Sequence, residues 1–289
     1  MAPKHLFVPF VIALSQLPQS TTGREIPDTL RSFYDSIISE KSCSNKLADG
    51  FYSTEEGSDN FDYCGDYLDE FDVIYISGKG NALTNMDVDC DGAYNKTTDD
   101  GRCGSSTDTQ GQTSFQYEFE EYDLGLTDLD ANVHPYVVFG NVGDTEGFAE
   151  YDPKWDGVEP LSLIAVVCNN KLVYGIWGDY NGDDGDKSLV GEASISLATL
   201  CYGDNITGGN GHDEDDVLYI AFVGTDAVPG AQGANWTAGD PEIFEDSIAD
   251  LGDQLVSRIT GSASGVWRQS TVYCATVGAI VAVMLSNFM

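Results

Sequence analysis

The sequence predicts a mainly β protein of the α+β class, folded as a compact single domain, with a small closed β-barrel and flanking helices as the expected architecture. Three observations lead to this prediction. Short runs of β-branched and aromatic residues fill the middle of the chain, separated by loops rich in Gly and Asp. Apolar residues at helical spacing occur near both ends. Finally, no linker, repeat or low-complexity tract divides the chain.

Each element follows from a local pattern, starting with a helix over residues 27–41, where Pro27 suits a first turn. Asn169 and Asn170 tolerate the left-handed backbone of a two-residue turn, so residues 161–177 should form a hairpin whose strands are buried on both faces. Asp240-Pro241-Glu242 should open the last helix. Strands are expected at residues 71–77, 113–119, 136–139, 161–168, 172–177 and 217–223.

The two ends have the patterns of processing signals, which leave residues 24–260 as the folded domain. Residues 1–23 combine a basic start, a short apolar stretch and a small-residue exit, which is typical of a secretory signal peptide. Residues 261–289 combine small residues, a spacer and an uncharged apolar tail, the pattern of a GPI-attachment signal. A plain C-terminal membrane anchor is the alternative for the tail.

The net charge of the chain argues against some classes of binding partner. The net charge is −35, so nucleic acids and anionic membranes would be repelled. Three interpretations agree with so acidic a chain: a halophile-like surface, a calcium-loaded secreted module, or a protein that acts on a cationic substrate. Composition alone does not choose among them.

The cysteines and sequons favour an oxidising, secretory compartment. Of seven cysteines, only Cys274 lies in the apolar tail, and an even number remains to form disulfides. We expect all six to be paired, with Cys90–Cys103 and Cys168–Cys201 favoured for their modest loop lengths. Three N-glycosylation sequons begin at Asn95, Asn205 and Asn235.

Several kinds of site have no support in the motifs. No Gly-x-Ser-x-Gly turn, Cys-x-x-Cys pair, His-Glu-x-x-His motif or phosphate-binding loop is present, and we expect neither metal nor cofactor. Residues 87–92 resemble the first half of a calcium loop. Thr98, however, stands where the bidentate Glu belongs, so a solvated acidic turn is the preferred interpretation.

Asp179 and Glu192 form the candidate catalytic pair. An apolar strand is expected to end at Trp177, so Asp179 would lie on a polar loop, remain ionised and activate water. Glu192 lies among small and apolar residues just before a short helix expected over residues 194–202. Those neighbours favour a raised pKa and the role of general acid. Glycoside hydrolysis needs two such carboxyl groups, but a turn-forming Asp and a helix-end Glu would give the same pattern.

Residues near this pair are candidates for substrate binding. Aromatic rings could stack on sugars, and acidic side chains could pair with ammonium groups, although solvated loop acids would look the same. The candidates are Trp177, Tyr180, Asp183, Asp184, Tyr151, Asp152 and Trp155.

Several blocks resemble the fungal chitosanases of glycoside hydrolase family 75. They are YGIWGDYNGDD from Tyr174, VGEASISLATLCY from Val190, DVLYIAFVG from Asp216, MDVDCDG from Met86, GQTSF from Gly111 and IADLGDQLV from Ile248. The resemblance implies a secreted, inverting endo-chitosanase whose essential Asp and Glu map to Asp179 and Glu192. Its expected partner is chitosan, and we expect a monomer, held at the cell surface if the tail receives a lipid.

Two alternatives stay open. One is a non-catalytic acidic surface protein that binds calcium or mediates adhesion. The other is an endo-β-1,4-glucanase that uses the same two carboxyl groups.

Overall fold

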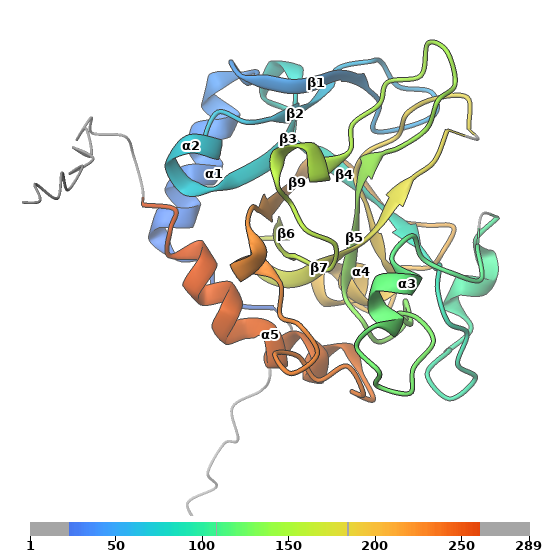
Figure 1. Ribbon diagram of the computed structural model, residues 1–289. Coiled ribbons are helices and arrows are strands. Elements are labelled where there is room, and N and C mark those ends of the chain that lie inside the picture. The colour runs from blue at the N-terminus through green and yellow to red at the C-terminus, as the bar shows by residue number, and fades with distance from the viewer. Residues whose placement is uncertain (1–22, 108, 184, 261–289) are drawn as a thin grey trace, which may run out of the picture.

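The computed structural model describes residues 23–107, 109–183 and 185–260, which form a nine-stranded sheet with helices at its periphery (Figure 1). In space the strands follow the order β1-β2-β3-β9-β4-β8-β5-β7-β6. The strands are β1 (Lys46–Phe51), β2 (Phe61–Cys64), β3 (Val73–Gly78), β4 (Thr84–Asp89), β5 (Tyr136–Asn141), β6 (Leu163–Cys168), β7 (Lys171–Asn181), β8 (Glu192–Ser194) and β9 (His212–Phe222).

Strand β9 closes part of the sheet into a ring. Its first half pairs with β4, and its second half pairs with β6 on one side and β3 on the other, so that Ala221 lies opposite both Ile164 and Ile74. Strands β9, β4, β8, β5, β7 and β6 therefore form a closed circuit, and β3, β2 and β1 extend from it. The predicted mainly β, α+β single domain is confirmed.

The β6–β7 hairpin is as the sequence predicts. Asn169 and Asn170 have φ values of 44° and 57°, which a two-residue turn of the left-handed type requires. All residues of β6 are buried, as are Leu172 to Asp179 in β7. Strand β7 is longer than expected, however, and continues past Trp177 to Asn181. The candidate Asp179 therefore lies on a strand and not on a loop.

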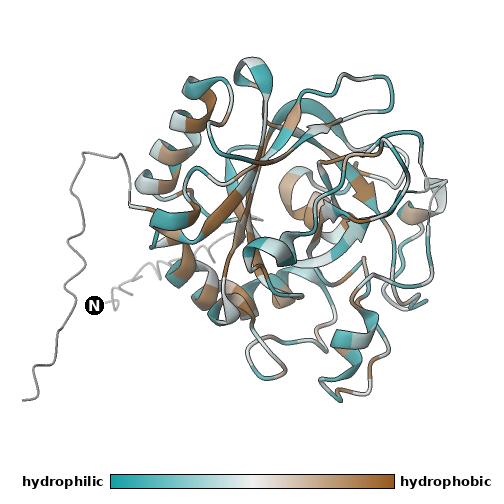
Figure 2. Cartoon of the chain, turned by 45° about the horizontal axis from the view of Figure 1, so that its top comes forward, coloured by the Kyte–Doolittle hydropathy of each residue, from teal (hydrophilic) through white to brown (hydrophobic). Residues whose placement is uncertain are grey.

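Helices pack against the outside of the sheet through their apolar faces (Figure 2). In α1 (Asp28–Glu40), Leu30, Phe33 and Ile37 are buried at helical spacing. In α5 (Pro241–Val256), the Asp240 side chain caps the first turn by accepting from the N–H of Ile243. The remaining α-helices are α2 (Leu68–Phe71), α3 (Gln116–Glu120) and α4 (Ile195–Tyr202).

The strand predicted at residues 113–119 is wrong. A turn and helix α3 occupy this stretch, and the buried rings of Phe115 and Phe119 are four positions apart, as on one helical face. Thr113 begins the turn by donating its N–H and its hydroxyl to the Asp128 carboxylate, each at 2.7 Å. That side-chain contact comes from a distant part of the chain, so local β-propensity did not reveal it.

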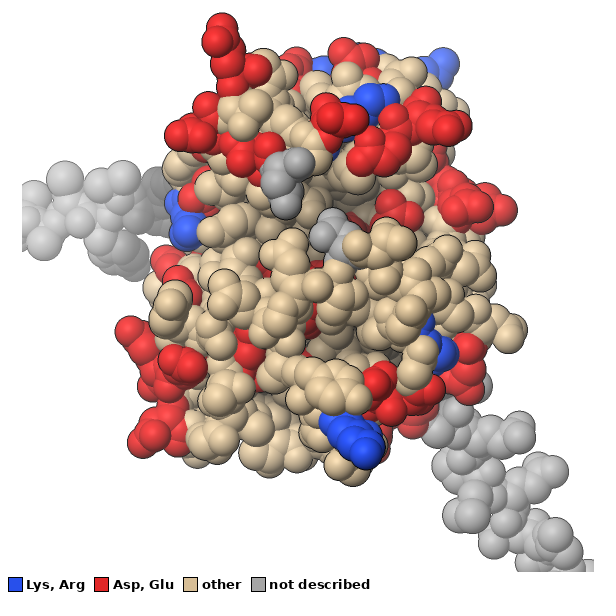
Figure 3. All heavy atoms as spheres, turned by 90° about the vertical axis from the view of Figure 1, so that its right-hand side faces the viewer, with Lys and Arg blue, Asp and Glu red and all other residues tan. Residues whose placement is uncertain are grey.

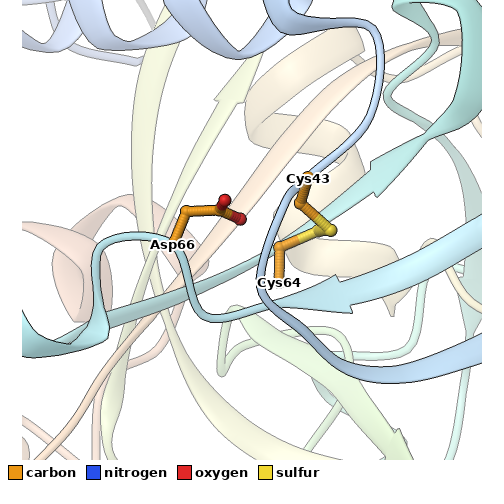
Figure 4. A group of neighbouring side chains, drawn as sticks. All are labelled: Cys43, Cys64 and Asp66. Atoms are coloured by element: carbon orange, nitrogen blue, oxygen red, sulfur yellow. A yellow bond between two sulfur atoms is a disulfide. The ribbon is translucent and has the colours of Figure 1, made fainter.

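Three disulfides join the six described cysteines, which confirms that all of them are paired. Cys90–Cys103 and Cys168–Cys201 are the two favoured pairs, and Cys43–Cys64 is the third. Asp66 lies beside the third bridge (Figure 4), where its carboxylate accepts from the N–H groups of Ser44 and Asn45. Because both sulfur atoms are in the disulfide, this group is structural and not a metal centre.

Candidate active site

A row of side chains crosses four neighbouring strands on one face of the sheet. Val138 on β5 lies opposite Asp179 on β7 in one direction and opposite Glu192 on β8 in the other. Glu192 in turn lies opposite Asp87 on β4. Since directly paired residues on adjacent strands present their side chains to the same face, the two candidate catalytic carboxyl groups point the same way, with Val138 between them.

A β-bulge places Asp179 in this row. Val137 pairs with Trp177 and Val138 with Asp179, so Gly178 is the extra residue of β7. Glycine is required there because a Cβ would lie 2.6 Å from Cβ of Tyr136. Bulges change the face to which the following side chain points. Here the bulge sends Asp179 to the opposite face from Trp177, which is fully buried.

Asp179 is buried and firmly held. The residue is 5% exposed. Its Oδ1 accepts the N–H of Ser114 at 3.1 Å and the N–H of Tyr180 at 2.8 Å. The Ser114 hydroxyl donates to the same oxygen. Burial raises the pKa of Asp179 to about 7, while these donors act in the opposite direction. The expectation of a polar, solvated loop is therefore wrong.

Glu192 is half-buried at the first position of β8. Two residues later, Ser194 caps α4 by accepting the N–H of Leu197, which confirms the short helix predicted after Glu192. The side chain therefore projects from a short strand that β4 and β5 hold on either side.

The row lines an open cavity of about 370 Å³. Six Asp and Glu residues line this cavity, and no Lys or Arg does so among the described residues. Figure 3 shows acidic side chains spread widely over one face of the molecule, with few basic ones among them. The cavity is lined by Asp87, Asp89, Asp91, Gln110, Gln112, Thr113, Ser114, Val138, Asp179, Tyr180, Asn181, Gly182, Asp183, Leu189 and Glu192.

Asp87, Asp89 and Asp91 are site residues that the sequence did not assign to the cavity. Asp87 and Asp89 alternate along β4, so they share the face of Glu192. Burial raises the pKa of Asp87 to about 6 and the pKa of Asp89 well above its usual range. One carboxylate oxygen of Asp89, of Asp91 and of Asp179 lies within 4.8 Å of the others. The period-two alternation of acidic residues was the signal that could have revealed them.

The resemblance of residues 87–92 to a calcium loop does not hold in three dimensions. Asp87 and Asp89 belong to an extended strand, whereas a calcium loop is strongly curved around its ion. Thr98, at the position of the missing Glu, donates its hydroxyl to Asp130 at 2.5 Å. The preferred interpretation of a solvated acidic turn is wrong as well, because Asp89 is only 5% exposed.

Two of the candidate substrate-binding residues line the cavity. Tyr180 is half-buried there, next to Asp179. Asp183 also lines the cavity, and its carboxylate accepts the N–H groups of Asp144 and Thr145, each at 2.7 Å. Hydrogen bonds from Thr145 hold the pKa of Asp183 below its usual value. Asp184 lies outside the described residues.

The other candidates are elsewhere. Trp177 and Tyr151 are buried, so the expectation that their rings stack on sugar is wrong. The Trp177 indole N–H donates to the main-chain oxygen of Asp179, and the Tyr151 hydroxyl donates to Asp156. Trp155 is 63% exposed but does not line the cavity, and Asp152 caps the turn beside it by accepting the N–H of Lys154.

Comparison with known proteins identifies the family. A family profile described as fungal chitosanase of glycosyl hydrolase group 75 matches residues 86–258, which include the whole acidic row. The chain belongs to this family of fungal chitosanases. An endo-chitosanase of Aspergillus oryzae is 43% identical over 250 residues, covering 86% of this chain and 96% of the relative. Endo-chitosanase B of the same species is 45% identical and an endo-chitosanase of Aspergillus fumigatus 44% identical, each covering 83% of this chain and 94% of the relative.

Membership of this family of glycoside hydrolases agrees with the resemblance seen in the sequence. Within the described residues, no helix is long and apolar enough to cross a membrane. The signal-peptide and lipid-attachment patterns lie outside those residues, apart from Gly23.

Proposed function

We propose that this chitosanase cleaves β-1,4 linkages within chitosan with inversion, using Asp179 as general base and Glu192 as general acid. The observation that carries the proposal is the row Asp179–Val138–Glu192. Neighbouring strands are roughly 4.8 Å apart, so the two backbones are separated by roughly 10 Å. Inverting enzymes hold a water between carboxyl groups that are roughly 6.5–9.5 Å apart, whereas retaining enzymes need roughly 5–5.5 Å.

The hydrogen bonds of Asp179 support its role as base. Three donors converge on Oδ1 and stabilise the ionised carboxylate. The positive charge of a bound chitosan chain would lower the pKa of Asp179 below about 7. Burial alone does not distinguish the general acid from the general base, because Asp179, the proposed base, is more buried than Glu192.

The reaction then follows from the positions of the two groups. Asp179 takes a proton from a water that attacks the anomeric carbon, and Glu192 gives its proton to the glycosidic oxygen as the bond to the anomeric carbon breaks. One face of the sugar receives the water and the other loses the leaving chain, so the new reducing end is the α-anomer. Protons are afterwards exchanged with solvent to restore both groups.

The acidic wall of the cavity supports a cationic substrate. Each deacetylated sugar of chitosan carries a protonated amine below neutral pH, and carboxylates of the wall, such as Asp183, can attract it. The similar proteins described above are endo-chitosanases, which agrees with this substrate. We expect hydrolysis to slow as salt screens the attraction and as acetylation removes the charges.

Paired substitutions test the proposal. Asp179→Asn and Glu192→Gln should each lower kcat/KM on chitosan by at least roughly a hundredfold while the circular dichroism spectrum stays unchanged. Asp35→Asn and Glu242→Gln, on exposed surfaces of α1 and α5, are the matched controls. Proton NMR of the first products should show the α-anomer. Substantial turnover by either folded active-site variant would remove that residue from the mechanism, and a β-anomer would exclude inversion.

The same assays distinguish the alternatives. Equal rates on chitosan and on an uncharged β-1,4-glucan would favour a glucanase, and calcium binding without hydrolysis would favour a non-catalytic surface protein. Carboxymethylcellulose, a polyanion, should be a very poor substrate because the acidic cavity repels it.

We also propose that the protein is secreted and held at the cell surface by a lipid near residues 262–264. The three disulfides support passage through an oxidising compartment. A GPI-specific phospholipase should release the protein, and truncation before Gly261 should send it into the medium. Release by detergent alone would instead indicate a retained membrane segment.

A further inference from the structure

Asp89 lies close to both of the proposed catalytic groups. It lies on β4, next to the strand of Glu192, and one of its carboxylate oxygens is within 4.8 Å of an oxygen of Asp179. Asp89 and Asp179 are each 5% exposed, so water screens their charges poorly. Two buried negative charges this close repel one another, and such a pair holds a proton over a wide pH range.

The hydrogen bonds decide which member of the pair holds that proton. Asp179 Oδ1 accepts from Ser114 N–H, Ser114 Oγ and Tyr180 N–H, all of which favour the ionised form. Asp89 has two donors, the N–H of Asp91, which Oδ1 accepts at 2.7 Å, and the Tyr136 hydroxyl. Asp179 therefore has the larger set of donors that stabilise a negative charge, and Asp89 is the better place for the proton.

The titratable groups that face Asp89 among the described residues are four carboxyl groups, which oppose its ionisation, and the Tyr136 hydroxyl, whose hydrogen bond favours it. They are Asp87 on β4, Asp91 just after it, Tyr136 on β5, Asp179 on β7 and Glu192 on β8. None of them is cationic. Burial, followed by the charges of Glu192 and Asp179, raises the pKa of Asp89 well above its usual range.

We propose that Asp89 is a positioning residue that stays protonated at the working pH, so that Asp179 can be the ionised member of the pair. The inference rests on the proposed function, because it assigns to Asp179 the role of base. A neutral Asp89 adds no second negative charge beside Asp179. No bond to substrate is assigned to Asp89.

The test uses Asp89→Asn, because an amide has the shape of a carboxylic acid and carries no charge. We expect kcat/KM within about tenfold of the wild type, whereas Asp179→Asn should cost at least roughly a hundredfold. The acid limb of the kcat/KM profile should keep its position in Asp89→Asn. A shift of that limb to lower pH by about a unit or more would show that the wild-type Asp89 is ionised, since removal of a negative charge lowers the pKa of Asp179. That result, or full inactivation of folded Asp89→Asn, overturns the inference.

A spectroscopic readout separates this inference from the proposed mechanism. Glu192→Gln removes the proton of the proposed acid, so difference infrared spectra of this variant should still show the C=O band of a protonated carboxyl group near neutral pH. The band should lose the intensity of one carboxyl group when Asp89→Asn is added to Glu192→Gln, while Asp87 and Asp179, with pKa values of about 6 and about 7, supply the remainder. An unchanged band in the double variant would assign the proton elsewhere and refute the inference. Full activity of Asp179→Asn would refute the proposed function and leave the infrared result unchanged.

Discussion

Ser114→Ala removes one of the three donors that stabilise the Asp179 carboxylate. The serine hydroxyl and its N–H both bond to Oδ1 of Asp179, and only the hydroxyl is lost in alanine. The N–H groups of Ser114 and Tyr180 remain in place. The substitution therefore changes the ionisation of Asp179 more than its position.

The size of the effect follows from the strength of a charged hydrogen bond. Such bonds contribute about 1.5–3 kcal/mol, and one pKa unit corresponds to about 1.36 kcal/mol. With two donors remaining, we expect the pKa of Asp179 to rise by about one unit. A base must be ionised, so activity should fall at pH values below the new pKa and recover at pH values above it.

The assay is the pH dependence of kcat/KM on a highly deacetylated chitosan. The acid limb of the Ser114→Ala profile should move to higher pH by about one unit, with the maximal rate little changed. Ser39→Ala is the matched control, because the exposed Ser39 hydroxyl bonds to the Ser36 carbonyl of its own helix. An upward shift of the alkaline limb instead would show that Asp179 works in its protonated form, and the assignment of base and acid would have to be exchanged.

Three further predictions concern the bulge, a disulfide and metal ions. Gly178→Ala places a Cβ 2.6 Å from Cβ of Tyr136, so it should lower activity and reduce the free energy of unfolding by about 1–3 kcal/mol in urea titrations. An unchanged kcat/KM would show that the bulge does not position Asp179. Replacing Cys168 and Cys201 by serine opens a loop with a sequence separation of 33 and should cost about 3–4 kcal/mol in the same titration. Dialysis against EDTA should leave the rate on chitosan unchanged, and a loss restored by calcium would contradict the metal-free mechanism.

Local sequence patterns determined much of the framework. The hairpin could be predicted because Asn169 and Asn170 adopt a backbone that few other residues tolerate. Helix α1 begins after Pro27, whose fixed φ suits a helix start, and α5 begins after Asp240, whose side chain accepts the N–H of Ile243. Two of the three disulfide pairs, Cys90–Cys103 and Cys168–Cys201, could be named from their modest loop lengths, and the candidate catalytic pair from a motif.

Only the tertiary structure decided how the site is assembled. Val138 is distant from Asp179 and Glu192 in the sequence, yet strand pairing places it directly between them. The same pairing brings Asp89 beside both, and the bulge at Gly178 gives Asp179 and Trp177 opposite faces. Register depends on contacts between distant segments, and a shift of one residue moves a side chain to the other face of a sheet. For that reason the sequence alone indicated the two candidate carboxyl groups. Their burial, their neighbours and their protonation states depend on the tertiary structure.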